Sequence, residues 1–314
     1  MKISIVIPTL KENYPYLKMC VDSIKKYSHE NHEIIVAVNN LKGEEIPDTI
    51  KQIEGIKLLA INEQGQGRAT NLAVEQAINK YILVADDDTV FPPNWEELTE
   101  KAKEVEFLSG VFMENGKKGG IAPAFIQGDC GNTPEEFDWN KWKKESIERR
   151  EEKMENGFGF PLVCKKELWQ KVEGYDSDGY DPWGSNIESD LEYKIMLYGI
   201  MPKRWRGVIT YHFAQISGTF TKPEAEPYLQ KNRSYFERKW GIARAKALMI
   251  WYCEFGIPLD TLRYRPDWAN FTENNKNIIP NDDFNKCIEC SKCRFYYLDF
   301  RYDKCPRCGE IKHE

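Results

Sequence analysis

The chain contains the run Tyr81-Ile82-Leu83-Val84-Ala85-Asp86-Asp87-Asp88, the segment most informative about its architecture. Its five apolar residues are typical of a parallel strand that is buried on both faces. The run ends in three carboxylates at the carboxyl end of the strand, where ligands bind in sheets of this kind. Carboxylate oxygens suit Mg²⁺ or Mn²⁺, but aspartates are also common in turns. The triplet alone therefore leaves a metal site and an ordinary turn equally open.

The segments before this run alternate between two periodicities. Apolar runs predict strands at 1–9, where Pro8 breaks the strand, and at 33–38 and 56–61, while helical spacing occupies 16–24 and 69–79. Strands alternating with helices in short units predict an α/β fold with a mostly parallel, doubly wound sheet. Polar or glycine residues follow each strand, where a nucleotide would lie.

A series of motifs, in a fixed order, extends this pattern along the chain. The series resembles family-two glycosyltransferases of the GT-A fold, which are Rossmann-like, inverting and dependent on nucleotide sugars. The resemblance covers roughly residues 1–245. It rests on Ile5-Val6-Ile7-Pro8-Thr9, Gly67-Arg68-Ala69-Thr70-Asn71, Asp86-Asp87-Asp88, Phe91-Pro92-Pro93-Asn94-Trp95, Trp183-Gly184, Glu188-Ser189-Asp190-Leu191, Tyr211-His212 and Lys239-Trp240-Gly241.

The resemblance implies a role for each polar residue of the donor side. Asp86 would contact the ribose of the donor, and Asp88 would bind the Mn²⁺ or Mg²⁺ ion that bridges the diphosphate. His212 matches the position that often supplies a late metal ligand, although a lone histidine at a strand end is more often simply packed. Asp87 is expected in the same donor site.

The resemblance also places the nucleotide against three loops. Residues of the first loop match the segment that wraps the base, and Asn39 replaces the aspartate that commonly reads it, so the identity of the base stays open. Glycines allow close approach of the backbone to phosphates, and Arg68 offers a partner for one, although the usual arginine of the family aligns with Thr70. An ordinary glycine turn explains the third loop equally well. The expected nucleotide-sugar residues are Pro8, Thr9, Leu10, Glu12, Asn39, Gly67, Arg68, Asp86 and Asp87.

Two acids match the motif that supplies the catalytic base of the family. An inverting transfer needs a base that takes the proton of the acceptor hydroxyl. Ser189 separates Glu188 from Asp190, whereas the commoner form of the motif has adjacent acids. Alignment on Asp190 slightly favours Glu188 as the base, with Asp190 as the alternative. The other acid would cap or orient a helix that begins near Leu191.

The region between the metal motif and these acids is less informative. The segment 119–126 predicts a strand, and the charged segment 137–155 predicts an exposed helix. Trp139 and Trp142 either dock this helix on the body, which is the favoured interpretation, or form an arm that stacks on sugars. Residues 156–162 resemble the floor of an acceptor cleft.

A cysteine cluster near the end of the chain carries a second signal. Two Cys-x-x-Cys pairs are typical of a zinc ribbon, in which four thiolates close a structural site for Zn²⁺. Cys287 with Cys290 is an alternative first pair, and disulfides or a rubredoxin-type iron centre are less favoured. Interleaved basic and aromatic residues suit nucleic acid, but docking or protein contact is favoured. The predicted zinc ligands are Cys290, Cys293, Cys305 and Cys308.

Length and composition set the remaining expectations. A chain of 314 residues with formal net charge −6 allows one large domain plus an appendage and argues against general binding of nucleic acid. We expect a glycosyltransferase domain at 1–265, a linker at 266–285 and the ribbon at 286–314. No apolar run is long enough to span a membrane and no signal peptide is evident, so a cytoplasmic enzyme without a membrane span is expected.

The sequence leaves several alternatives to a glycosyltransferase with a nucleotide-sugar donor and a hydroxyl acceptor such as a glycan, a small molecule or modified nucleic acid. A nucleotidyltransferase also holds Mg²⁺ on paired aspartates, but the first strand here lacks a glycine-rich basic loop. An inactive GT-A domain could act as a binding module. A narrower variant transfers sugar to hydroxylated bases in DNA, with the ribbon gripping the duplex.

Overall fold

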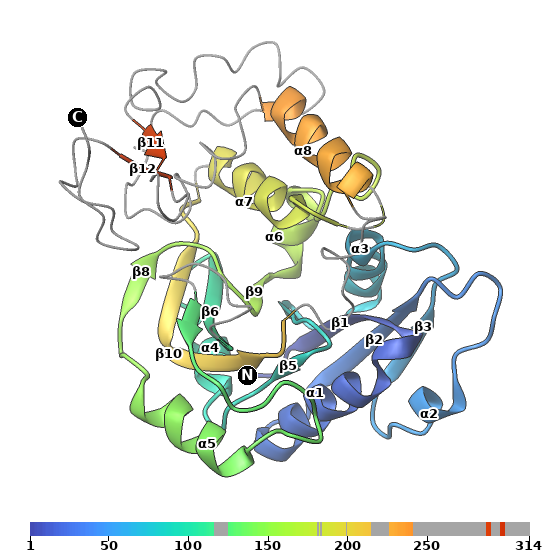
Figure 1. Cartoon of the computed structure of the whole chain (residues 1–314), viewed down its shortest axis with the longest axis vertical. Coiled ribbons are helices and arrows are strands. Elements are labelled where there is room, and N and C mark those ends of the chain that lie inside the picture. Colours follow the sequence, from blue (N-terminus) through green and yellow to red (C-terminus); the bar gives the residue numbers. More distant parts are fainter. Residues whose placement is uncertain are drawn as a thin grey trace.

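The computed structural model describes residues 1–115, 125–180, 182, 184–198, 200–214, 226–240, 287–289 and 296–298. In these residues the chain forms an α/β fold built on a ten-stranded mixed sheet (Figure 1). The main path of the sheet runs β3-β2-β1-β4-β9-β6-β10-β5, with β7 paired to β6 and β8 paired to β10.

The N-terminal half of the sheet is parallel, as the alternating pattern predicts. Its strands are β1 (Ser4–Leu10), β2 (Glu33–Asn39), β3 (Lys57–Ala60) and β4 (Tyr81–Val84). The pairs β1–β2, β2–β3 and β1–β4 are all parallel. The connecting helices are α1 (Tyr14–Tyr27), the short α2 (Asp48–Lys51) and α3 (Gln66–Gln76). The predicted order of elements is confirmed, and α3 begins earlier than expected, directly after Gly65.

Pro8 does not break the first strand, contrary to the prediction. Strand β1 continues through Pro8 to Leu10 and pairs with β2 along its whole length. Val6 accepts a hydrogen bond from the Ala85 N–H, so Pro8, two residues further on, faces the same side of the strand. Strand β4 has ended there, and the missing N–H of proline therefore costs no ladder hydrogen bond.

The other half of the sheet is mixed. Five of the nine strand pairings in the described sheet are parallel and four are antiparallel. Strand β9 (Leu162–Lys165) lies antiparallel between β4 and β6 (Phe107–Glu114). Strand β10 (Lys203–His212) then runs parallel to β6. The short strands β5 (Thr89–Val90) and β8 (Met154–Asn156) pair antiparallel with β10, and β7 (Phe125–Gln127) pairs parallel with β6. Most of the segment 119–126, where a strand was expected, lies outside the described residues.

Helices cover both faces of this sheet. Apolar residues of α1 and of α4 (Glu96–Lys101) pack on one face with Ile5, Ile7 and Val36. On the other face, α3, α6 (Lys166–Lys171) and α7 (Ile187–Leu197) pack on Val6, Ile35 and Ala37. Helix α8 (Glu226–Trp240) joins this second layer and lies beside α7 (Figure 1).

Helix α5 (Trp139–Glu148) docks on the body of the protein. Its N-cap residue Asp138 accepts hydrogen bonds from the Asn140 and Lys141 N–H groups. Trp142 is buried against Tyr211, with ring centroids 5.8 Å apart. Trp139 is half-buried and meets the Phe137 ring edge-on at 5.0 Å. Trp142 is therefore a docking residue, as the favoured interpretation held.

Near the end of the chain, β11 (Cys287–Glu289) pairs antiparallel with β12 (Tyr296–Leu298). Cys290, Cys293, Cys305 and Cys308 lie outside the described residues, as does the expected linker at 266–285. Over the described part of the chain, none of the helices has the length and apolar character needed to cross a bilayer.

Candidate active site

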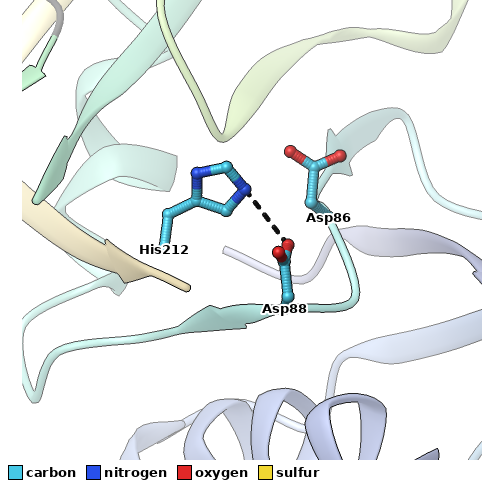
Figure 2. A group of neighbouring side chains, drawn as sticks. All are labelled: Asp86, Asp88 and His212. Atoms are coloured by element: carbon cyan, nitrogen blue, oxygen red, sulfur yellow. Dashed lines mark ion pairs between the residues drawn. The ribbon is translucent and has the colours of Figure 1, made fainter. Parts of the chain in front are cut away.

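Three side chains from the carboxyl ends of two strands, β4 and β10, lie close together at one edge of the sheet. Asp86 and Asp88 follow β4, and His212 is the last residue of β10. Each offers one ligand atom, and these atoms all lie within 4.8 Å of one another. His212 Nε2 lies 3.2 Å from Asp88 Oδ1. Figure 2 shows the His212 ring facing Asp88, with Asp86 beside them. The structure thus brings together the outer aspartates and the histidine that the sequence singled out.

Glu114 contacts the His212 imidazole at Nδ1, the ring nitrogen that does not face Asp88. Tyr211 pairs with Met113 in the parallel β6–β10 register, so the next residues, His212 and Glu114, are neighbours. Glu114 is buried, and its Oε1 lies 2.5 Å from His212 Nδ1. The Phe112 ring stacks on the imidazole at 4.3 Å. Burial opposes the charged imidazole, but Asp88 and Glu114 outweigh it and hold the pKa of His212 well above its usual value.

Sequence reasoning missed Glu114. The available signal was an acid at the end of the apolar stretch Phe107–Glu114, a strand that ends at the same edge of the sheet. A carboxylate that fixes the second ring nitrogen of a histidine is the usual outer partner of a metal-binding imidazole.

Asp86 has a different environment from Asp88. Gln66, the first residue of α3, donates from Nε2 to Asp86 Oδ1 at 3.0 Å. Burial is the largest cause that raises the pKa of Asp86 to about 6; Asp88 and Glu114 add to it, and His212 opposes it. Three carboxylates therefore share this space with one imidazole, and a divalent cation would relieve their repulsion.

Asp87 is turned away from this group. Its Oδ2 accepts hydrogen bonds from Thr9 Oγ1 at 2.5 Å and from Asn13 Nδ2 at 3.0 Å. The middle aspartate therefore ties the end of β4 to the end of β1. Of the residues expected to wrap the base, Pro8 and Thr9 are buried at the end of β1, Leu10 is half-buried, and Glu12, just after β1, is exposed.

The Asn39 side chain links by hydrogen bonds the three segments in which the nucleotide was expected. Its amide nitrogen donates to the Thr9 carbonyl at 2.8 Å, and its Oδ1 accepts from the Gly65 N–H at 3.2 Å. This buried side chain fixes the ends of β1 and β2 against the loop that precedes α3. The sequence placed Asn39 at this site but did not predict that its side chain links these segments.

Gly67 and Arg68 occupy contrasting positions at the start of α3. A Cβ atom at Gly67 would lie 2.2 Å from Ile187 Cδ1, so the glycine lets α3 approach α7 closely. Arg68 is partly exposed and pairs with Asp178 at 2.9 Å.

A pocket of about 280 Å³ opens next to the Asp86 partner Gln66. Its wall combines the loop before α3, the turn before α7, and one residue of α8. The lining residues are Glu63, Gln64, Gly65, Gln66, Gly67, Arg68, Ser177, Asp178, Tyr180, Pro182, Gly184, Ile187 and Lys231.

The two acids of the acceptor-side motif both lie in the first turn of α7. The helix begins at Ile187, which corrects the expected start near Leu191. Asn186 adopts a left-handed conformation with φ of 71°, and its carbonyl already accepts the Asp190 N–H at 3.0 Å. The helical ladder therefore starts upstream of both acids.

Glu188 and Asp190 differ in their exposure to solvent. Asp190 is fully buried and contacts Tyr180 Oη at 3.1 Å and Lys239 Nζ at 2.8 Å. Glu188 is partly exposed. The pKa of the Tyr175 hydroxyl is well above its usual value, mainly through burial and then through the charges of Glu188 and Asp86. The negative charges of Glu188 and Asp86 therefore both disfavour ionisation of the Tyr175 hydroxyl.

Comparison with known proteins agrees with this architecture. The family model "Glycosyl transferase family 2" matches residues 4–160. A relative from Methanocaldococcus jannaschii, the uncharacterized glycosyltransferase MJ1057, is 27% identical over 206 residues, which are 62% of this chain and 67% of the relative.

Solved structures are similar to this chain at low sequence identity. GalNAc-T7, crystallised with UDP, GalNAc and Mn²⁺, matches with a TM-score of 0.54 and 15% identity over 90% of this chain and 54% of its own. TarS residues 1–349 of S. aureus match with a TM-score of 0.49 and 13% identity over 90% of this chain and 82% of that one. The GalNAc-T7 likeness agrees with the expected GT-A fold. With half of its length matched by the family model, the chain belongs to glycosyltransferase family 2 and is a glycosyltransferase.

Proposed function

We propose that this glycosyltransferase moves a sugar, with inversion, from a nucleotide diphosphate sugar to a hydroxyl acceptor, with Mn²⁺ or Mg²⁺ held by Asp88 and His212. Asp86, which the sequence assigns to the ribose of the donor, lies close enough to both to serve as a third ligand. The observation that carries the proposal is the meeting of these three side chains within 4.8 Å at the carboxyl end of β4. The crystallisation of GalNAc-T7 with UDP and Mn²⁺ supports a nucleotide donor and this class of ion.

The donor set suits such an ion. Two carboxylates and one imidazole offer oxygen and nitrogen ligands, a mixture that Mn²⁺ accepts more readily than Mg²⁺. Three protein ligands leave coordination positions for diphosphate oxygens, and a bound ion would neutralise the charge of the departing nucleoside diphosphate. Glu114 fixes the hydrogen on Nδ1 of His212, so that Nε2 faces the acids.

Glu188 is the base in this proposal. It is partly exposed in the first turn of α7, whereas Asp190 is fully buried and engaged with Tyr180 and Lys239. The Glu188 carboxylate takes the proton of the acceptor hydroxyl while the oxygen of that hydroxyl bonds to the anomeric carbon. The bond from that carbon to the diphosphate breaks in the same step, and the attack from the opposite face inverts the centre.

The loops at the ends of β1 and β2 are proposed to hold the nucleotide. Pro8, Thr9, Leu10 and Asn39 surround this end of the sheet, and Asn39 links the two strand ends to the loop of Gly65.

Thermal unfolding with a panel of nucleoside diphosphates, each with and without Mn²⁺, tests the donor site. A ligand that binds the folded state stabilises it by about 2.7 kcal/mol at a hundredfold excess over its Kd. We expect a Mn²⁺-dependent shift with one nucleotide, its loss in Asp88→Asn, and its retention in Asp22→Asn, a surface control. Absence of any shift across the panel contradicts the proposal.

Two substitutions in α7 test the base assignment. Glu188→Gln should keep nucleotide binding but lower donor turnover, followed as release of nucleoside diphosphate, by about 10²–10⁴-fold. Asp190→Asn should mainly lower the unfolding temperature. If Asp190→Asn keeps its stability and loses turnover while Glu188→Gln stays active, Asp190 is the base instead.

We also propose that the chain divides into the enzyme at 1–265, a linker at 266–285 and a zinc ribbon at 286–314. The support is the spacing of Cys290, Cys293, Cys305 and Cys308 together with the antiparallel pair β11–β12, which flanks the first Cys-x-x-Cys. One zinc per chain by elemental analysis, lost in the double variant Cys290→Ser/Cys293→Ser, is the expected result. A zinc-free purified protein that binds none on addition speaks against the ribbon.

A further inference from the structure

Helix α8 presents a stripe of three polar side chains to the acceptor side of the site. Lys231, Tyr235 and Lys239 are spaced four residues apart, and residues at this spacing share one face of a helix. Lys231 lines the pocket beside Gln66. Tyr235 Oη donates to Asp176 Oδ2 at 2.9 Å, and its ring meets that of Tyr180 edge-on at 5.0 Å. Figure 1 shows α8 lying along α7.

Lys239 joins two acids from different segments. Its Nζ lies 2.5 Å from Asp176 Oδ2, in the turn before α7, and 2.8 Å from Asp190 Oδ1, in the first turn of α7. The Lys239 side chain is 11% exposed and the Asp190 side chain 0%. Carboxylates this deeply buried require a compensating cation. Burial works against the charged ammonium, but Asp190 and Asp176 outweigh it and raise the pKa of Lys239.

Lys194 does not replace this contact. Its Nζ lies 3.8 Å from Asp190 Oδ2 and donates to the Gly174 carbonyl. Burial lowers the pKa of Lys194 to about 8, against the pull of Asp190. The closer ammonium to Asp190, and the one that also reaches Asp176, is that of Lys239.

The segment that Lys239 holds carries both the proposed base and a wall of the pocket. Glu188 lies two residues before Asp190 in the first turn of α7, a turn that has no side-chain cap of its own. Tyr180 lines the pocket and donates its hydroxyl to Asp190. A shift of Asp190 would therefore move the base and the pocket wall together.

We propose that Lys239 is a positioning residue, which clamps Asp176 and Asp190 so that the first turn of α7 presents Glu188 to the acceptor and Tyr180 to the pocket. This inference rests on the proposed function of Glu188. A misplacement of a reacting group by about 1 Å can cost about 10²-fold in rate, so the clamp should appear in kcat.

The test compares Lys239→Met, Lys239→Arg and the exposed same-helix control Ser234→Ala. Donor turnover is followed as nucleoside diphosphate release, and binding of UDP with Mn²⁺ is followed by calorimetry. For Lys239→Met we expect kcat to fall about 10–100-fold. The affinity for UDP·Mn²⁺ should stay within about threefold of the parent, because neither Asp176 nor Asp190 belongs to the proposed metal site of Asp86, Asp88 and His212. Lys239→Arg should recover at least about a third of kcat because it keeps the charge, and Ser234→Ala should match the parent.

A double-mutant cycle keeps the test decisive if Lys239→Met folds poorly. In the Asp190→Asn background Lys239 has lost its charged partner in α7 and keeps only Asp176, so Lys239→Met should cost at least about fivefold less in kcat than it does alone. The unfolding temperature should show the same coupling. Equal losses in both backgrounds, or full kcat in Lys239→Met, overturn the clamp.

Failure of the proposed function has a separate signature. If UDP and related diphosphates fail to bind with Mn²⁺, or if Glu188→Gln turns over normally, the assignment of the site is wrong. The coupling of Lys239 and Asp190 in unfolding temperature would still be measurable in that case.

Discussion

Three consecutive aspartates follow β4, and each has a different partner. Asp86 accepts from Gln66, Asp87 from Thr9 and Asn13, and Asp88 faces His212. Asp87 and Asp88 lie in the turn that follows β4, and in this turn the outer two side chains share one space while the middle one joins the neighbouring strand. Three residues of identical chemistry therefore have different roles, because their side chains point in different directions and meet different partners.

Glu114→Gln tests whether the imidazole needs a charged partner. The substitution keeps a hydrogen-bond acceptor beside Nδ1 of His212 but removes the negative charge, which now lies 2.5 Å from the ring nitrogen. Loss of such an outer partner typically weakens metal affinity by about 10–100-fold, and we expect that loss in a Mn²⁺ titration followed by electron paramagnetic resonance. The exposed Glu44, paired with Lys11, supplies the control Glu44→Gln. Equal Mn²⁺ affinity in both variants would show that Glu114 only packs.

Helices α3 and α7 come into close contact at Gly67 of α3, which has no side chain. Gly67 faces Ile187 and Tyr175, and the same contact brings Gln66 toward Asp86 and Ile187 into the pocket wall. The close contact of the two helices therefore supports both the group formed by Asp86, Asp88 and His212 and the helical turn that carries Glu188.

Gly67→Ala should destabilise the protein although alanine favours helix. The new Cβ would lie 2.2 Å from Ile187 Cδ1 and 3.2 Å from Tyr175 Cβ. Overpacking of this kind costs about 1–3 kcal/mol, against a gain of about 1 kcal/mol in helix propensity. Ile187→Val removes the clashing Cδ1, so the double variant should regain part of the loss in urea unfolding. A single variant as stable as the parent would contradict this packing.

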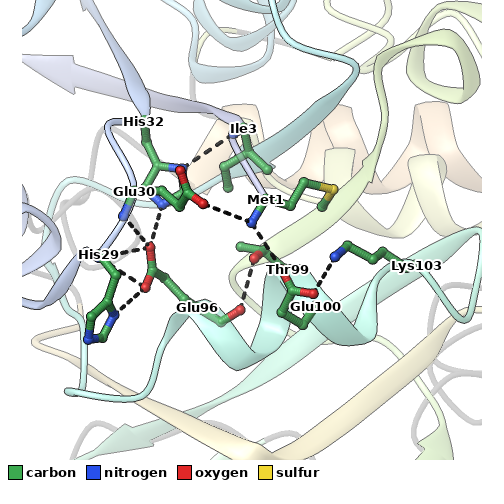
Figure 3. A network of polar contacts seen from close by, with 9 residues as sticks. All are labelled: Met1, Ile3, His29, Glu30, His32, Glu96, Thr99, Glu100 and Lys103. Carbon is green, nitrogen blue, oxygen red and sulfur yellow. Dashed lines mark hydrogen bonds and ion pairs between the residues drawn. The ribbon is translucent and has the colours of Figure 1, made fainter.

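Across the whole molecule, a polar network joins segments that are far apart in sequence (Figure 3). His32 Nδ1 accepts from the Ile3 N–H at 3.3 Å, so Nε2 carries the hydrogen and donates to Glu96 at 2.8 Å. Glu96 also accepts from the His29 N–H at 3.1 Å. The start of β1, the connection from α1 to β2, and α4 are thereby held together. Burial opposes the ionised Glu96, yet the hydrogen bonds from His32 and His29 lower its pKa to about 2.

The depressed pKa of Glu96 makes part of the stability dependent on pH. Because the folded pKa lies below the unfolded value, the contribution is complete above about pH 4.5 and is lost as pH falls toward 2. After allowance for solvent screening it amounts to about 1–2 kcal/mol. Glu96→Gln should therefore lower the free energy of unfolding at pH 7 and flatten its decline between pH 4.5 and 2, as urea titrations at several pH values would show. A parallel decline in both proteins would mean that other acids carry the effect.

Much of the fold and part of the site could be predicted from the sequence. Periodicity and turn residues are local signals, so the order β1-α1-β2-β3-α3-β4 was correctly predicted, and so was the docking of Trp142. The motif order led to Asp86, Asp88 and His212, which the structure places together. Roles for Glu188 and for the cysteine pairs remain proposals.

Tertiary structure decided what depends on pairing between distant segments. The antiparallel insertion of β9 between β4 and β6 made the sheet mixed, and no local pattern in β9 specifies its direction. The β6–β10 register placed Glu114 behind His212, 98 residues away in sequence. The docking of α8 buried Asp190 against Lys239 and left Glu188 partly exposed. The sequence by itself determined which groups could take part in the chemistry; their orientation and burial were decided by long-range strand register and helix packing, because these set which side chains face each other.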